Sequence, residues 1–189
     1  MGVRRWTGTA VACAGLVLLA LAGAPAWHGP GGGAAAGRAP VAYAPSRPGP
    51  GTPIARLAIP RLGERWTVVE GVGATSLAAG PGHYPQTALP GAVGNFAVAG
   101  HRARGVFRDL DRLTRGDAVI VEYGRRVFTY TVTGSRVVAP TAVEVLAPVP
   151  DAPDATATVA TLTLTTCEPK WSADRRLVVH ATLDPGEVP

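Results

Sequence analysis

Cys167 is the residue whose position most clearly suggests chemistry. Leu and Thr alternate through residues 161–166, and this alternation predicts a strand with Cys167 at its end, on the face that carries threonines. A thiolate is a strong nucleophile, but a free thiol has a pKa of about 8.5 and needs help to ionise at neutral pH. The alternative is a packed and inert cysteine, which is the commoner role of this residue.

A histidine is the usual partner of a nucleophilic thiol, and the chain has four. His101 ends the apolar run 95–100 and begins a polar loop, where catalytic groups are often found. His83 lies in a turn-rich segment, where it would order a loop, and His180 lies inside a predicted strand. His101 is therefore a candidate general acid and base, with an ordinary loop histidine as the alternative.

An acyl-transfer site also needs a group that stabilises the developing oxyanion. Arg175 and Arg176 begin the apolar run 177–179, a short loop after Cys167. The start of this second strand can therefore return beside the end of the first, bringing a permanently charged guanidinium to the thiol. The alternative is a pair of solvated surface arginines.

The elements that must position these residues are strands. The 189 residues are 47% hydrophobic and 16% charged, with 24 Gly and 18 Pro, which excludes a coiled coil. Short β-branched runs alternate with turn residues and show no βαβ order, so we expect an all-β barrel or sandwich. Strands are expected at residues 55–59, 66–70, 95–100, 118–123, 126–132, 136–138, 157–165 and 177–182, and short helical turns at 75–79, 106–113 and 141–146.

The N-terminal segment predicts export. Arg4 and Arg5 precede a long uncharged stretch bracketed by Trp6 and Trp27, and a helix between these tryptophans would be about 31 Å long. This pattern indicates a membrane anchor with its N-terminus in the cytoplasm. The alternative is a cleaved signal peptide, because residues 24–26 offer a small–x–small cleavage pattern.

Three parts follow from this pattern: residues 1–27, a cytoplasmic tip and anchor or signal; residues 28–53, a Gly/Pro/Ala-rich tether; and residues 54–189, the folded domain. Export leaves Cys167 as the one thiol outside the membrane, unable to form an internal disulfide. The formal net charge is +5, but the basic residues are scattered, so no nucleic-acid partner is expected. Metal-binding and phosphate-binding motifs are absent, so we expect no metal and no cofactor.

Three motifs together resemble the sortase family. Residues 163–167 read TLTTC, similar to the T-L-x-T-C signature, and residues 176–181 read RLVVHA, similar to the R-L-V-V-x-A strand. Residues 97–102 read AVAGHR, similar to the A-G-H-R segment. The resemblance covers residues 54–183 and is nearest to class E, the housekeeping-type actinobacterial sortases, through the segments 80–85, 88–91, 94–96 and 146–150.

The resemblance implies an eight-stranded sortase-type β-barrel with a few short helices and a cysteine transpeptidase. Cys167 would attack the Thr–Gly carbonyl of an LPXTG-like or LAXTG-like sorting signal. His101 would protonate the leaving amine and deprotonate the incoming one, and Arg176 would stabilise the tetrahedral intermediate. Thr165 and Thr166 are the candidate substrate-binding residues.

The implied partners are surface proteins that carry a sorting signal, a peptidoglycan precursor amine and the membrane, reached through the N-terminal helix. The implied location is the cell membrane, with a single pass and an extracellular catalytic domain. Two departures from the family pattern stand near the site: a short loop at residues 101–107, and Glu168 directly after the cysteine. The rival functions are a secreted thiol peptidase that hydrolyses its substrate and a non-catalytic envelope-binding module.

Overall fold

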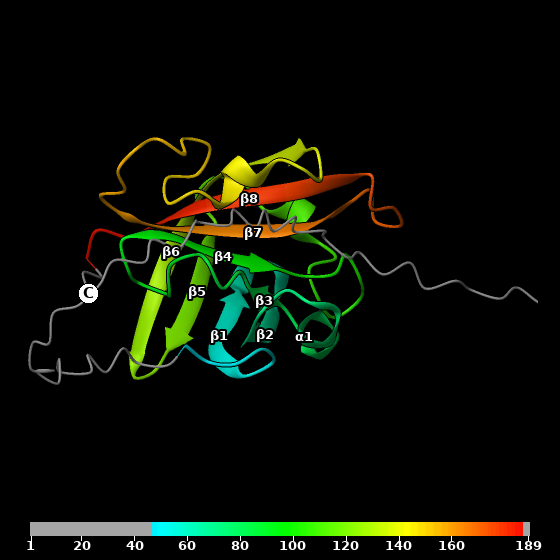
Figure 1. Cartoon of the computed structure of the whole chain (residues 1–189), viewed down its shortest axis with the longest axis horizontal. Coiled ribbons are helices and arrows are strands. Elements are labelled where there is room, and N and C mark those ends of the chain that lie inside the picture. Colours follow the sequence, from blue (N-terminus) through cyan, green and yellow to red (C-terminus); the bar gives the residue numbers. More distant parts are fainter. Residues whose placement is uncertain (1–46, 187–189) are drawn as a thin grey trace, which may run out of the picture.

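The computed structural model describes residues 47–186, and within this range eight strands form a closed barrel. Around the barrel the strand order is β1-β2-β3-β4-β7-β8-β6-β5 (Figure 1). The strands are β1 (Pro53–Ile59), β2 (Glu64–Glu70), β3 (Gly82–His83), β4 (Gly94–Ala99), β5 (Ala118–Tyr123), β6 (Arg126–Val138), β7 (Ala160–Glu168) and β8 (Arg175–Leu183). This architecture confirms the expected eight-stranded all-β barrel.

The helices in the described part of the chain are short. They are α1 (Ala74–Ala79) and three 3-10 turns: η1 (Pro60–Leu62), η2 (Leu110–Arg112) and η3 (Val143–Leu146). Helical turns were expected near three of these places. The expected turn at 106–113 is helical only over η2, because the preceding residues form tight turns that pack Phe107 into the core.

Some strand boundaries differ from those expected. The two runs 126–132 and 136–138 form a single strand, β6, because an irregular register between Val132 and Gly134 lets pairing with β8 continue. β7 lies three residues further along than expected, since residues 166–168 continue to pair with β8. The two-residue strand β3 was not predicted, because so short a segment has no periodicity.

Alternation along the strands builds the core. In β7, Leu162 and Leu164 are fully buried inside the barrel, together with Phe96 and Val98 of the neighbouring β4. The intervening residues of both strands point to the outer face of the sheet. This division into two faces decides which side chains can meet at the strand ends.

The expected anchor at residues 1–27 lies outside the described residues, as does most of the expected tether. The last residues of that tether are hydrogen-bonded to the barrel. Gly51 N–H donates to Glu70 O at 2.8 Å, and Glu70 N–H donates to Thr52 O at 2.8 Å. Within residues 47–186, no helix has the length and apolar character needed to cross a bilayer.

Candidate active site

The strands β4 and β7 bring His101 and Cys167 to the same end of the barrel. They are parallel neighbours (Figure 1), with Ala99 opposite Thr165 in the register. His101 and Cys167 each follow two positions after these partners. Side chains in a strand repeat their direction every two residues, so Cys167 shares the outer face of the sheet with Thr165, while His101 lies just beyond the end of β4 at the same end of the barrel. His101 is exposed and Cys167 is half-buried.

Arg176 reaches the same place from β8. β7 and β8 are antiparallel, and Cys167 is the register partner of Arg176. Partners of this kind lie on the same face, with their Cβ atoms about 5 Å apart. The guanidinium of Arg176 donates from Nη1 to Ala173 O and Arg175 O, both at 2.9 Å, which holds it at the mouth of the loop after Cys167. Arg175 is opposite Glu168 and therefore belongs to the other face.

The two threonines before the cysteine have different surroundings. Thr165 shares the outer face with Cys167, and its Oγ1 lies 3.1 Å from the hydroxyl of Tyr84. Thr166 is 2% exposed, and its Oγ1 donates to Gly100 O at 2.8 Å. The Thr166 hydroxyl thus ties β7 to the backbone before His101, and a substrate contact by either threonine remains a prediction. Sequence patterns did not single out Tyr84 as a candidate, because its partner is distant in the chain.

Gly100 is required by the packing behind His101. A Cβ atom at this position would lie 2.6 Å from the ring of Phe107. Phe107 is held in turn by Trp66, at a centroid distance of 5.2 Å in an edge-to-face arrangement, and the Trp66 indole N–H donates to Gly105 O at 2.8 Å. The loop after His101 therefore packs its apolar side chains into the end of the barrel.

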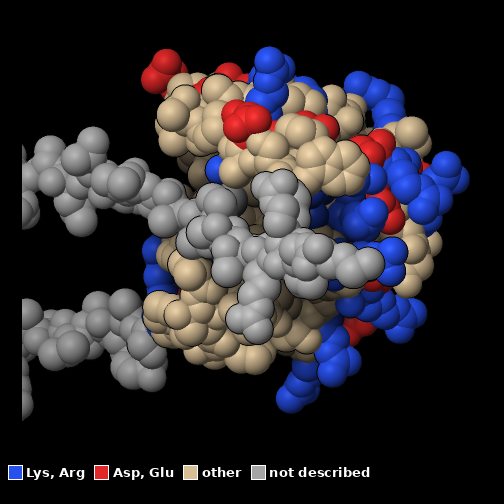
Figure 2. Space-filling model, turned by 90° about the vertical axis from the view of Figure 1, so that its right-hand side faces the viewer, with Lys and Arg blue, Asp and Glu red and all other residues tan. Residues whose placement is uncertain are grey.

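Arg102, the residue after His101, points the other way and is buried at the end of the barrel. Its Nε donates to Arg108 O at 2.7 Å, and its Nη2 lies 3.1 Å from Asp111 Oδ1. Its Nη1 donates to Glu168 Oε2 at 2.8 Å and to Cys167 O at 3.3 Å. The carboxylate of Glu168, which departs from the family pattern, is thus paired with a guanidinium. Figure 2 shows this end of the molecule, where basic and acidic side chains are interspersed.

A second polar cluster lies on the outer face further back along β7. Thr163 Oγ1 donates to Asn95 Oδ1 at 2.8 Å and lies 3.0 Å from His180 Nδ1. Asn95 Nδ2 donates to Val145 O and to Ala147 O, both at 3.1 Å, and so holds η3 against the sheet. This cluster fixes the β6–β7 connection next to the strand that carries Cys167.

Burial lowers the pKa of His180 below its ordinary value and outweighs the attraction of Asp151, while Arg136 lowers it further. Asp151 Oδ2 lies 3.5 Å from His180 Nε2 and belongs to the same β6–β7 connection. The imidazole therefore favours its neutral form, in which the Thr163 contact is an ordinary hydrogen bond. His180 is a half-buried strand residue, and it is separated along β8 from Arg176.

The third histidine is also part of the framework. His83 is 1% exposed, and its Nδ1 lies 2.8 Å from Glu70 Oε2. Its Nε2 lies 3.1 Å from Ala88 O, so the ring orders the loop after β3. His83 is thus a buried residue of the framework, paired with the Glu70 carboxylate.

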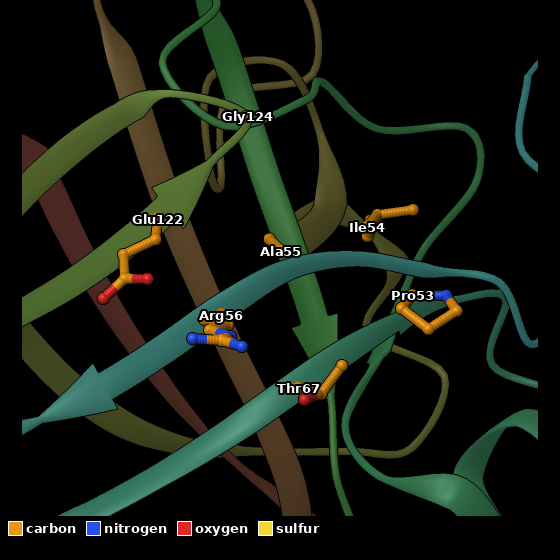
Figure 3. Close-up of a pocket in the computed structure, with 7 residues that line it drawn as sticks. All are labelled: Pro53, Ile54, Ala55, Arg56, Thr67, Glu122 and Gly124. Atoms are coloured by element: carbon orange, nitrogen blue, oxygen red, sulfur yellow. The ribbon is translucent and has the colours of Figure 1, made fainter.

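Two hollows on the described surface lie apart from these residues. One, of about 530 Å³, lies over β1, β2 and the β5–β6 turn (Figure 3), where Arg56, Thr67 and Glu122 line it. The other, of about 230 Å³, is lined by Glu70, His83 and the loop after β3. Cys167, His101 and Arg176 line neither. Among residues 47–186, no three His, Cys, Asp or Glu side chains are grouped as they would be around a metal ion.

The arrangement supplies the three functions that acyl transfer through a thioester needs. The residues that carry a nucleophilic sulfur, an imidazole and a guanidinium lie at one end of three adjacent strands, and Cys167 and Arg176 share a face there. A substrate carbonyl placed over Cys167 would lie between an acid–base group and a positive charge.

Comparison with known proteins shows which family the chain resembles. Residues 57–184 match the family model of the sortase domain. Sortase SrtE1 of Streptomyces coelicolor is 35% identical over 140 residues, which cover 69% of this chain and 40% of that protein. Sortase A of Streptococcus agalactiae is 32% identical over 139 residues, covering 69% of this chain and 53% of that protein. The chain therefore matches about half the length, or less, of these curated relatives.

Solved structures are similar over most of their length. Sortase E from Streptomyces avermitilis has a TM-score of 0.64 and 44% identity, covering 72% of this chain and 90% of that one. SrtA sortase from Actinomyces oris has a TM-score of 0.68 and 38% identity, covering 74% and 83%. Sortase E1 from Streptomyces coelicolor, solved with a tripeptide in its active site, has a TM-score of 0.67 and 34% identity, covering 71% and 90%.

Proposed function

The chain belongs to the sortase family and is class E-like, and we propose that it is a cysteine transpeptidase that joins proteins to a cell-wall amine. Its substrate would be a sorting signal of the LPXTG or LAXTG type, cleaved between Thr and Gly. The observation that carries the proposal is the register of the three strand ends: Cys167 is paired with Arg176, and His101 lies two residues beyond the end of β4, the parallel neighbour of the cysteine strand.

The first half-reaction forms a thioester. The Cys167 thiolate attacks the carbonyl carbon of the Thr–Gly bond, and the Arg176 guanidinium stabilises the negative charge that develops on the carbonyl oxygen. The imidazolium of His101 gives its proton to the departing Gly nitrogen. The Thr–Gly bond breaks, the C-terminal fragment leaves as an amine, and the sorting-signal acyl group remains on Cys167.

The second half-reaction transfers the acyl group. His101, now neutral, removes a proton from the incoming amine of a peptidoglycan precursor as the amine attacks the thioester carbonyl. The thioester breaks, an amide forms, and the thiolate of Cys167 is restored beside a protonated His101. The imidazole therefore begins and ends the cycle in the same state, and no external oxidant or reductant is needed.

The test uses the full chain with a panel of pentapeptides, LAXTG and LPXTG among them, and a panel of amines. We expect a mass increase on the protein equal to the acyl fragment, and an amide product that depends on the added amine. C167A should abolish both. A product that is only the free acid, at any amine concentration, would point to a thiol peptidase instead. Absence of acyl-enzyme in the wild-type chain would contradict the proposal and favour a binding module.

The location is part of the proposal. Arg4 and Arg5, followed by the apolar segment before Trp27, support an N-terminal anchor with the barrel on the outer side of the membrane. Such an anchor would keep the enzyme beside both membrane-held substrates. In cells, alkaline extraction should leave the full chain in the membrane fraction, and protease added outside should digest the barrel. A chain recovered wholly in the culture medium would support a cleaved signal peptide.

A further inference from the structure

Arg102 is next to the exposed His101 in the chain, yet all three nitrogens of its own guanidinium group contact other residues of the described structure. Its side chain is 2% exposed, and its three nitrogens reach Arg108 O, Asp111, Glu168 and Cys167 O. Arginine fits such a site because its planar group presents several donors in fixed directions, whereas lysine presents a single point charge. A buried guanidinium is costly unless every partner is in place, so these contacts define its position closely.

The contacts connect the two residues that flank His101 with those that flank Cys167. On the N-terminal side, Gly100 N–H donates to Thr165 O at 3.0 Å, and Gly100 O accepts from Thr166 Oγ1 at 2.8 Å. On the C-terminal side, Arg102 binds Cys167 O and Glu168. The backbone of His101 is thus fastened to the cysteine strand on both sides.

Ion pairs at the same end of the barrel connect the segment after His101 with the segment after Cys167. From the loop after His101, Asp109 and Asp111 reach Lys170 in the loop after Cys167, with Nζ at 3.2 Å and 3.3 Å from their oxygens. Arg102 in turn pairs with Glu168, the last residue of β7. Asp111 bridges both cations, which makes the group one connected network.

We propose that Arg102 is a positioning residue that sets the imidazole of His101 relative to the thiol of Cys167, acting with Glu168. The inference rests on the proposed function, because it concerns the efficiency of that same site. The β4–β7 ladder sets these strands in register only as far as Gly100, and the side chain of Arg102 continues the connection past the reacting residues. Without this side chain, the residues after His101 keep the Phe107 N–H to His101 O bond at 3.1 Å but lose their direct side-chain link to the cysteine strand.

R102K keeps the positive charge but removes the planar guanidinium group with its several donors. We expect kcat of transpeptidation to fall at least tenfold while KM stays within twofold, because geometry at the reacting atoms changes and the substrate surface does not. R104K, an exposed change in the same loop, is the matched control and should retain wild-type kcat. An R102K variant with kcat within twofold of wild type would overturn the proposal.

A loss of stability alone must be separated from a loss of positioning. V119A removes core methyl groups in β5, away from the site, and should lower the Tm without lowering kcat at a temperature where the barrel is folded. If V119A lowers kcat as much as R102K does for the same loss of Tm, Arg102 has a structural role only and the proposal fails. Alkylation of Cys167 by iodoacetamide gives a second readout, and we expect its pH–rate profile to change in R102K and to stay unchanged in V119A.

E168Q keeps the proposal testable if R102K does not fold. It preserves the shape and an acceptor for Arg102 but removes the charge, so we expect a smaller fall in kcat, of about threefold to tenfold. The double variant R102K/E168Q should lose much less than the product of the two single losses, because both act through one contact. Fully multiplicative losses would refute the coupling. The two proposals can fail separately. If the wild-type chain forms no amide product but the alkylation profile still changes in R102K, the proposed function is contradicted and the positioning role is supported.

Discussion

At the scale of single residues, the structure gives different surroundings to two neighbouring arginines, of which the family motif had selected Arg176. Arg176 is the register partner of Cys167, whereas Arg175 is opposite Glu168 on the other face and is exposed. Alternation along one strand makes neighbours in sequence differ completely in what they can reach.

The first prediction follows from this difference. R176A should reduce kcat by about 10²-fold or more, since it removes the charge that faces the developing oxyanion, whereas R175A should stay within about twofold of wild type. Steady-state kinetics on one sorting peptide measures both. Equal losses in the two variants would show that net charge, rather than placement, matters at this end of the barrel.

The second prediction concerns His180. Because burial lowers its pKa in the folded protein, the unfolded chain binds the proton more readily, and stability falls as pH drops from about 6.5 toward the folded pKa. Above about 6.5 both states are neutral and this contribution is constant. The difference in Tm between wild type and H180Q should therefore change below pH 6.5 and level off above it. A constant difference across pH 5 to 8 would contradict the lowered pKa.

Residues joined by side-chain contacts across the fold were the hardest to predict. Cys167, His101 and Arg176 stood out because strand ends and short motifs mark them. Arg102 is adjacent to His101 in the sequence, yet only the register of β4 and β7 shows that its guanidinium reaches Glu168. Tyr84 was missed for the same reason, since its contact with Thr165 joins segments that only folding brings together.

At the scale of elements, the loop between β4 and η2 depends on a close approach of backbone and ring. G100A, the third prediction, places a methyl group 2.6 Å from Phe107, so either the ring or the backbone of His101 must move. We expect a loss of about 1–3 kcal/mol in the free energy of unfolding and a fall in kcat. G134A in β6 is the control, since a Cβ there meets nothing within 4 Å. Denaturant titration of both variants measures the difference, and F107L should restore part of what G100A loses.

The fourth prediction concerns the β6–β7 connection, which Asn95 holds through Val145 O and Ala147 O. N95A should cost about 1–3 kcal/mol, because it removes the amide that donates to Val145 O and Ala147 O and accepts from the Thr163 hydroxyl. Amide hydrogen exchange should accelerate over residues 143–152. T161V, which removes a hydroxyl bonded only to Gly94 O, is the control and should leave exchange in that segment unchanged.

Element identity was predictable where a strand is long and alternating, as in β5, whose bounds were predicted correctly. It was less so in β7, where the turn-like residues after Thr165 gave no sign that pairing with β8 continues through Glu168. Because pairing continues through Glu168, Cys167 lies within the β7–β8 ladder and its backbone is held by a neighbouring strand.

At the scale of the whole molecule, the barrel order places the two C-terminal strands, β7 and β8, between β4 and β6. The sequence predicted the class and the approximate number of strands. It could not give this order from periodicity, because parallel pairing of β4 with β7 has no local signal.

The fifth prediction is metal independence, which stays an expectation from the sequence. The proposed cycle of acyl transfer uses only the side chains of Cys167, His101 and Arg176. Activity in 5 mM EDTA, a roughly thousandfold excess over the protein, should equal that in buffer, with added calcium giving no increase. A loss that calcium restores would show that an ion takes part.

The placement of β7 and β8 also has a consequence for biosynthesis. Two residues of the proposed triad, Cys167 and Arg176, lie on the two strands that are made last, and this strand pair enters between β4 and β6, which are already complete. A growing polypeptide therefore carries no working centre until it is almost fully made, and an incomplete or truncated copy that lacks residues 160–183 would be chemically silent rather than a stray acylating agent.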